Sequence, residues 1–120
     1  MYEPHAPLPG NRWTLSGNWT IGFEQVVLED GAGSISYRFR ARDAHLVMSA
    51  GEHGPIPFVV HLDGEPPGAS HGVDVDEDGR GVLTDGRLYQ LARAHERVEE
   101  RTLEITFLAP GAEAYVFTFG

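Results

Sequence analysis

The stretch ISYRFRAR, residues 35–42, decides the fold class of this chain. Apolar residues at positions 35, 37, 39 and 41 alternate with one serine and three arginines. Because successive side chains of a strand point to opposite faces, this period of two predicts a strand with one buried face. The same alternation recurs at residues 58–63, 103–108 and 114–119. The pattern therefore predicts half-buried β-strands along much of the chain.

Shorter apolar runs between turn signals predict five further strands. They lie at residues 19–23, 25–28, 44–48, 81–84 and 87–93. Dipeptides such as Asp30-Gly31 and Asp78-Gly79 predict the turns that separate the strands. The segment 91–101 is charged on every side, so we expect a loop there with at most one helical turn. Many short strands at this spacing predict an all-β fold, a single β-sandwich of jelly-roll, carbohydrate-binding-module-like type.

A chain of 120 residues has room for one domain. The first ten residues contain three prolines and a glycine, which predicts an extended lead-in or linker stub at 1–10 and the β-sandwich domain at 11–120. The alternation assigns seven apolar residues to inner strand faces. We expect the core to contain Phe39, Leu46, Phe58, Val60, Ile105, Phe107 and Val116.

The charge balance and the missing cysteines exclude several classes of function. Acidic residues outnumber basic ones by 18 to 9, and all nine basic residues are arginine. A net charge of −9 disfavours nucleic-acid binding and docking on anionic lipid. No apolar run has the length of a membrane span, and the N-terminus has no signal-peptide pattern. Without cysteine there is no thiolate for redox chemistry, and we find no nucleophile or carboxylate pair that would indicate an enzyme.

The acidic stretch at residues 74–79 is the sharpest local motif. Asp74, Asp76 and Asp78 alternate before Gly79, and Asp85 occupies the twelfth position of a calcium-loop template. Alternate carboxylates in such a loop converge on a hard cation, so one hypothesis is a structural calcium ion, the only cofactor that the sequence suggests. The alternative is an acidic hairpin turn, because no amphipathic helix flanks the motif.

Five aromatic residues could stack on the C–H faces of sugar rings: Trp13, Trp19, Tyr37, Tyr89 and Tyr115. Core packing is the commoner use of aromatic side chains. Trp19 and Tyr37 alternate in step with apolar neighbours, which favours the core for both.

For a ligand site we predict Arg87 and Tyr89, with polar help from His61, Asp63 and Asp74. Residues two apart on a strand share a face, so Arg87 offers a planar set of donors beside a stacking ring. In the alternative, Arg87 holds the acidic loop against the sheet through an ion pair with Asp74 or Asp85.

Six segments together resemble one family of domains. These are NRWTLSGNW at 11–19, ISYRFRAR at 35–42, LDGEPPG at 62–68, GVDVD at 72–76, RLYQL at 87–91 and AYVFTFG at 114–120. The combination resembles the C-terminal domain of DipZ-type thiol-disulfide interchange proteins, also called cytochrome c biogenesis or redoxin-family proteins. The resemblance spans residues 11–120.

The resemblance implies a non-catalytic, carbohydrate-binding-module-like jelly roll that follows a thioredoxin-like domain. It implies that the redox chemistry belongs to the Cys-x-x-Cys of that domain, that the location is extracytoplasmic, in the periplasm or cell envelope, and that the acidic loop is a structural turn. Two functions stay open. The module binds carbohydrate, or it is a structural or protein-interaction domain that positions the redox domain or its client.

Overall fold

The alternating segments form strands in the computed structural model, which describes residues 13–21, 25–52, 54–94 and 97–119. The predicted lead-in at 1–10 lies outside these residues. The described part contains eight strands and one short 3-10 helix, η1. Their bounds are β1 Trp13–Ile21, β2 Val26–Arg40, β3 Asp43–Ser49, β4 Ile56–Leu62, η1 Gly68–Ser70, β5 Arg80–Leu83, β6 Arg87–Arg93, β7 Glu100–Phe107 and β8 Glu113–Phe119.

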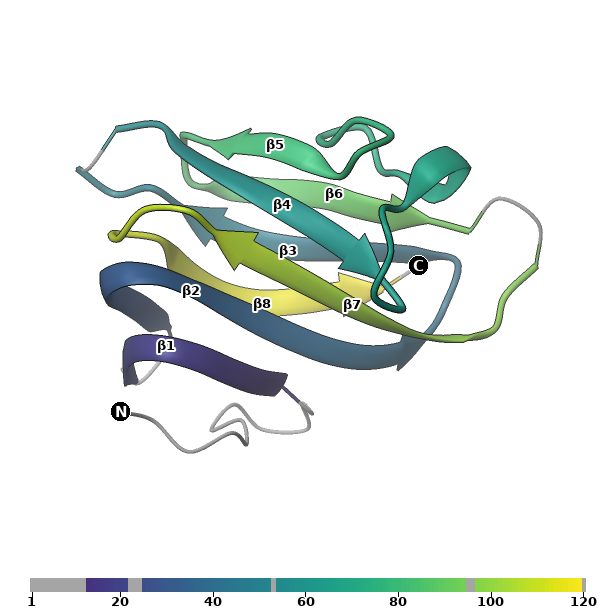
Figure 1. Cartoon of the computed structure of the whole chain (residues 1–120), viewed down its shortest axis with the longest axis horizontal. Coiled ribbons are helices and arrows are strands. Elements are labelled where there is room, and N and C mark those ends of the chain that lie inside the picture. Colours follow the sequence, from purple (N-terminus) through teal and green to yellow (C-terminus); the bar gives the residue numbers. More distant parts are fainter. Residues whose placement is uncertain (1–12, 22–24, 53, 95–96, 120) are drawn as a thin grey trace.

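All strand pairs are antiparallel, and they form one sheet in the order β5-β4-β7-β2-β8-β3-β6, with β1 also paired to β2. This sheet curls on itself, so that β4 and β7 form one layer and β3, β6 and β8 the facing layer (Figure 1). The rings of Phe58 on β4 and Tyr89 on β6 meet edge to face across the layers at 6.4 Å. The predicted all-β sandwich is confirmed, with its two layers formed by one continuous sheet.

The strand β2 is longer than the sequence predicted. We expected a turn at Asp30-Gly31 between two strands, but β2 runs without interruption over 15 residues. The register against β1 passes from Ser16↔Ser34 to Asn18↔Asp30, so extra residues of β2 bulge out of the pairing. Glycine permits this bulge, because a Cβ at Gly33 would lie 2.6 Å from the Leu28 side chain.

The core is as predicted except at β8. Six of the seven expected residues are buried: Phe39, Leu46, Phe58, Val60, Ile105 and Phe107. Val116 was assigned wrongly, because its side chain is 42% exposed. Pairing with β3 shifts register between Val47↔Val116 and Met48↔Ala114, which leaves Tyr115 without an opposite residue. This irregularity exchanges the faces of β8, so Ala114 and Phe117 are the buried pair.

The connection between η1 and β5 closes the open side of the curled sheet. The amides of Gly72 and Asp74 donate to the carbonyls of Leu91 and Gln90 on the free edge of β6. At its other end, the carbonyl of Gly79 accepts a hydrogen bond from the Val60 amide of β4. The segment at 72–79 therefore joins the two layers where no strand does. No helix in the described residues has the length and hydropathy to cross a membrane.

A pair of matched substitutions tests the exchanged faces of β8. We expect Val60→Ala to lower the free energy of unfolding by about 2–3 kcal/mol, because it leaves a cavity in the core. We expect Val116→Ala to change it by less than about 0.5 kcal/mol, because that side chain lies on the surface. Urea denaturation of the two variants measures both values. A large loss in Val116→Ala alone would contradict the observed register.

Candidate functional site

The structure brings two of the predicted site residues into direct contact. Arg87 Nη2 donates to Asp74 Oδ1 at 2.9 Å, and the other carboxylate oxygen of Asp74 accepts the Gln90 amide at 2.7 Å. Burial raises the pKa of Asp74, but the hydrogen bonds from Arg87 and Gln90 and the arginine charge outweigh it, so the pKa lies below its ordinary value. This geometry agrees with the second hypothesis for Arg87, in which an ion pair holds the acidic loop against the sheet. Asp74 connects the segment 72–79 to β6.

Tyr89 is part of the core. Its side chain is fully buried, and the Arg87 guanidinium carbon lies 3.8 Å from its ring centroid. The hydroxyl donates to the Asp85 carbonyl at 2.8 Å and accepts the Thr84 amide at 3.0 Å. Tyr89 therefore anchors the turn between β5 and β6, and its ring has no exposed face on which a ligand could stack.

His61 and Asp63 belong to a different cluster, at the end of β4. Asp63 accepts hydrogen bonds from the Arg101 guanidinium and from the Thr102 amide of β7. Burial raises the pKa of Asp63, but these bonds and the nearby arginine charges lower it overall. His61 is half-buried on β4 opposite Glu104. Among the described residues, no hydrogen bond or ion pair joins this cluster to Asp74 and Arg87, so the five predicted residues do not form one site.

The four aspartates of the acidic motif do not converge. Asp76 accepts the amides of Asp78 and Arg80 at 2.9 Å each, which makes a hydrogen-bonded turn, while Asp74 bonds to β6. Within the described residues, which include Asp85, no three acidic or histidine side chains lie close enough to hold a metal ion. The residues therefore do not fit a calcium loop, and the geometry is that of the acidic turn.

The other aromatic candidates are engaged in packing or hydrogen bonds. Trp19 is buried and donates from Nε1 to the Ser16 carbonyl at 2.9 Å. Tyr37 packs edge-on against Phe117 at 4.8 Å, and the Tyr115 hydroxyl bonds to its neighbour Glu113 at 2.9 Å. The side chain of Trp13 lies outside the described part of the chain.

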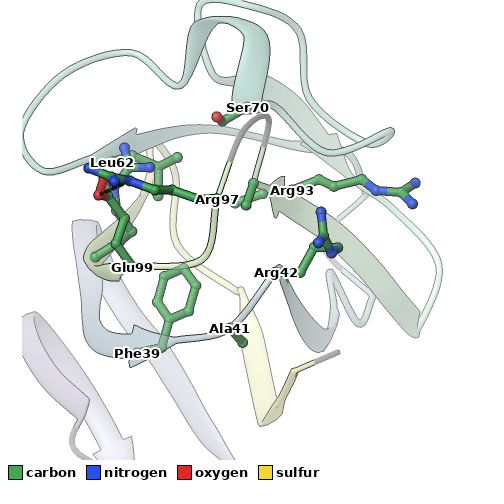
Figure 2. Close-up of a pocket in the computed structure, with 11 residues that line it drawn as sticks. Phe39, Ala41, Arg42, Leu62, Ser70, Arg93, Arg97 and Glu99 are labelled. Atoms are coloured by element: carbon green, nitrogen blue, oxygen red, sulfur yellow. Dashed lines mark ion pairs between the residues drawn. The ribbon is translucent and has the colours of Figure 1, made fainter.

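A small hollow at one end of the sandwich collects arginines that the sequence analysis did not group. Figure 2 shows Arg42 on one side of it and Arg97 with Glu99 on the other, with the Phe39 ring between them and Ser70 across the opening. We call it the arginine hollow. Its lining residues are Phe39, Ala41, Arg42, Leu62, Ser70, Ala92, Arg93, Ala94, Arg97, Glu99 and Arg101. Four of the nine arginines of the chain are thus gathered at one place.

The ion pairs around the arginine hollow are mostly loose. Arg93 lies 3.6 Å from Asp43, and Arg97 lies 3.6 Å from Glu99, both beyond hydrogen-bond distance. Only Arg101 is hydrogen-bonded to its carboxylate partner. In the described residues Arg42 has no acidic partner within ion-pair distance. Most of these guanidinium donors therefore remain available.

The sequence carried two weak signals for this site. They are the three arginines that alternate with apolar residues in the segment 35–42 and the charged segment 91–101. Arg38 lies outside the hollow and pairs with Glu100 at 2.9 Å. Arg42 belongs to the hollow, because the β2–β3 turn brings it close to Arg93 at the end of β6.

A second surface feature is an apolar groove along the outer side of β4 and β5. Pro57, Val59, Val82 and Leu108 form its apolar lining around a space of about 560 Å³. Val82 and Leu108 are each 52% exposed. Exposed apolar side chains gathered in this way are typical of protein-interaction surfaces.

Comparison with known proteins gives one family and a shared fold. A family model described as "Thioredoxin like C-terminal domain" matches residues 1–120. No curated protein sequence matches the chain. The fold is similar to a family two carbohydrate esterase from Clostridium thermocellum in complex with cellohexaose, at a TM-score of 0.67 and 12% identity over 90% of this chain and 31% of that one.

Two further esterases share the fold. One is a family two carbohydrate esterase from Cellvibrio japonicus, with a TM-score of 0.61 and 14% identity over 88% of this chain and 29% of that one. The other is an acetyl xylan esterase from Butyrivibrio proteoclasticus, with a TM-score of 0.54 and 8% identity over 95% and 32%. The chain spans about a third of the length of these enzymes. At such low identity the likeness is one of fold alone.

The contact of Asp74 predicts a pH-dependent contribution to stability. We expect Asp74→Asn to lower the free energy of unfolding by about 1–3 kcal/mol at pH 7, because it removes the ion pair with Arg87. The pKa of Asp74 is lowered in the folded state, so its contribution is complete above the ordinary carboxyl pKa of about 3.9 and is lost as the pH falls through the lower folded value.

Urea denaturation of the wild type and the variant at pH 7 and below pH 3 measures this difference. The matched control is Asp78→Asn, an exposed carboxylate in the same segment, for which we expect little change at either pH. Equal losses in the two variants would show that Asp74 does not anchor the segment.

Proposed function

The chain belongs to the thioredoxin-like C-terminal domain family, and on this premise we propose that it is a non-catalytic module of a thioredoxin-like protein that binds carbohydrate at the arginine hollow. The observation that supports the proposal is the cluster of four arginines with largely free donors beside an apolar floor. A ligand site typically combines an apolar surface with a few convergent polar groups.

The chemistry of the hollow suits a sugar with several hydroxyls. A guanidinium offers donors in a fixed plane, which can bond to hydroxyl and ring oxygens. The buried ring of Phe39 lines the hollow in Figure 2 and forms part of its apolar floor. The arginines of the site lie near the ends of β2 and β6, and their side chains are not committed to the core.

Because this chain has no cysteine, we propose that a neighbouring domain carries out the redox chemistry and this module the binding. Thiol-disulfide exchange requires a thiolate, so that step would fall to the thioredoxin-like part of the protein. The resemblance to DipZ-type proteins supports a Cys-x-x-Cys in that part and an extracytoplasmic location. In this proposal the module holds the redox domain close to glycans of the cell envelope.

The apolar groove supports a second candidate function, which is docking of the thioredoxin-like domain or its client. Val82 and Leu108 would bury their exposed surface in such a contact. Capture of the thioredoxin-like domain by the module, measured by calorimetry and lost in a Val82→Ser, Leu108→Ser variant, would support docking. The control is Val73→Ser, which changes an exposed valine outside the groove.

A binding titration tests the carbohydrate function. We first screen the module on a glycan array and then titrate the best oligosaccharide by calorimetry. We expect the double variant Arg42→Ala, Arg97→Ala to bind about tenfold more weakly or worse, because it loses two charged donors. The control Arg38→Ala removes an arginine of β2 that lies outside the hollow and should bind as the wild type does. No binding to any glycan on the array, or an equal loss of affinity in the double variant and in Arg38→Ala, would contradict the proposal.

A further inference from the structure

We infer that the arginine hollow selects an acidic carbohydrate, one that carries a carboxylate or another anionic group; this inference rests on the proposed function. The first reason is the distribution of charge. The chain has a net charge of −9, but the lining of the hollow holds four arginines and one glutamate. Asp43 and Asp63 pair with two of these arginines, so four cations stand against three carboxylates there, and this small excess of positive charge in an acidic protein favours an anion.

The second reason is how these arginines are held. Elsewhere in the fold, Arg38 and Arg87 bind their carboxylates at 2.9 Å, in hydrogen-bonded pairs. At the hollow, Arg101 is also hydrogen-bonded to its partner Asp63, but Arg93 and Arg97 keep their partners 3.6 Å away. The Arg97–Glu99 pair is exposed on both sides and contributes less than about 1 kcal/mol, so a ligand anion can replace Glu99 at little cost.

Asp43 limits which arginines a ligand can use. Among the described residues its buried Oδ1 atom accepts no hydrogen bond, and the Arg93 guanidinium lies 3.6 Å from it. Moving Arg93 away would leave a buried carboxylate oxygen without a countercharge, so Arg93 stays with Asp43. Arg42 has no acidic partner within ion-pair distance in the described residues, and its own guanidinium can offer two parallel donors to an incoming carboxylate.

The size of the hollow limits which part of a ligand can enter it. The space inside is about 10 Å³, which is room for about one water molecule. A sugar ring cannot enter such a space, but one oxygen of a ring substituent can, and the arginines favour an oxygen that carries negative charge. The ring would then lie over the mouth, near the Ser70 hydroxyl seen in Figure 2.

Three matched oligosaccharides test the inference: a neutral glucose oligomer, the corresponding uronate oligomer and a sulfated glucose oligomer. We expect the module to bind at least one of the charged oligomers about tenfold more tightly than the neutral one, with an affinity that falls as salt rises from 50 to 500 mM. A preference for uronate identifies a carboxylate as the recognised group, and a preference for sulfate identifies a sulfate ester.

Variants separate charge from geometry. Arg42→Ala should remove most of the preference for the charged oligomer, whereas Arg42→Lys should keep the salt dependence and lose part of the affinity. Circular dichroism checks that each variant is folded. Equal binding of all three oligomers would overturn this inference and leave the proposed function standing, whereas no binding to any of them, together with no binding on the glycan array, would overturn both.

Discussion

The bend in β2 is the constraint on which the rest of the structure depends. One strand pairs with β8 through Val26 and Val27 and with β7 through residues 33–40, so it belongs to both layers of the sandwich. It can do so only because the chain bulges at 30–33 without ending. A side chain at Gly33 would collide with Leu28 and with the Ser16 carbonyl, so the close packing of β1 on the bend requires glycine there. The facing layers, and hence the core between Phe58 and Tyr89, follow from this bend.

A curled sheet leaves its two ends, β5 and β6, unjoined. The segment 72–79 bridges this opening with backbone hydrogen bonds to β6 at one end and β4 at the other. Its polar residues therefore serve the fold: Asp74 bonds to β6, and Asp76 shapes the turn before β5. This explains why an acidic stretch that looks like a metal loop has none of its geometry. The carboxylates satisfy backbone amides, which would otherwise lack acceptors where the strands end.

The strands and most of the core were predictable, because alternation depends on local spacing alone. The exceptions are places where pairing departs from regular register. The bulge in β2 joined two predicted strands, and the irregularity at Tyr115 put Val116 on the surface. The contact of Arg87 with Asp74 was predicted as one of two alternatives. The arginine hollow was not, because Arg42 lies far in sequence from Arg93, Arg97 and Arg101 and meets them only where the ends of β2, β6 and β7 lie on the same side of the sandwich.

The position of the hollow explains how this fold could carry the proposed binding site without a loss of stability. The inner faces of the strands are filled by packed side chains, and Arg87 and Asp74 are needed to close the sheet. Arg42 and Arg97 lie beyond the strand ends and are not needed to close the sheet, since loose surface pairs add little to the free energy of folding. Side chains there can change without disturbing the scaffold that holds them. Arg93 and Arg101 pair with Asp43 and Asp63, so Arg42 and Arg97 are the cations of the hollow that the fold requires least.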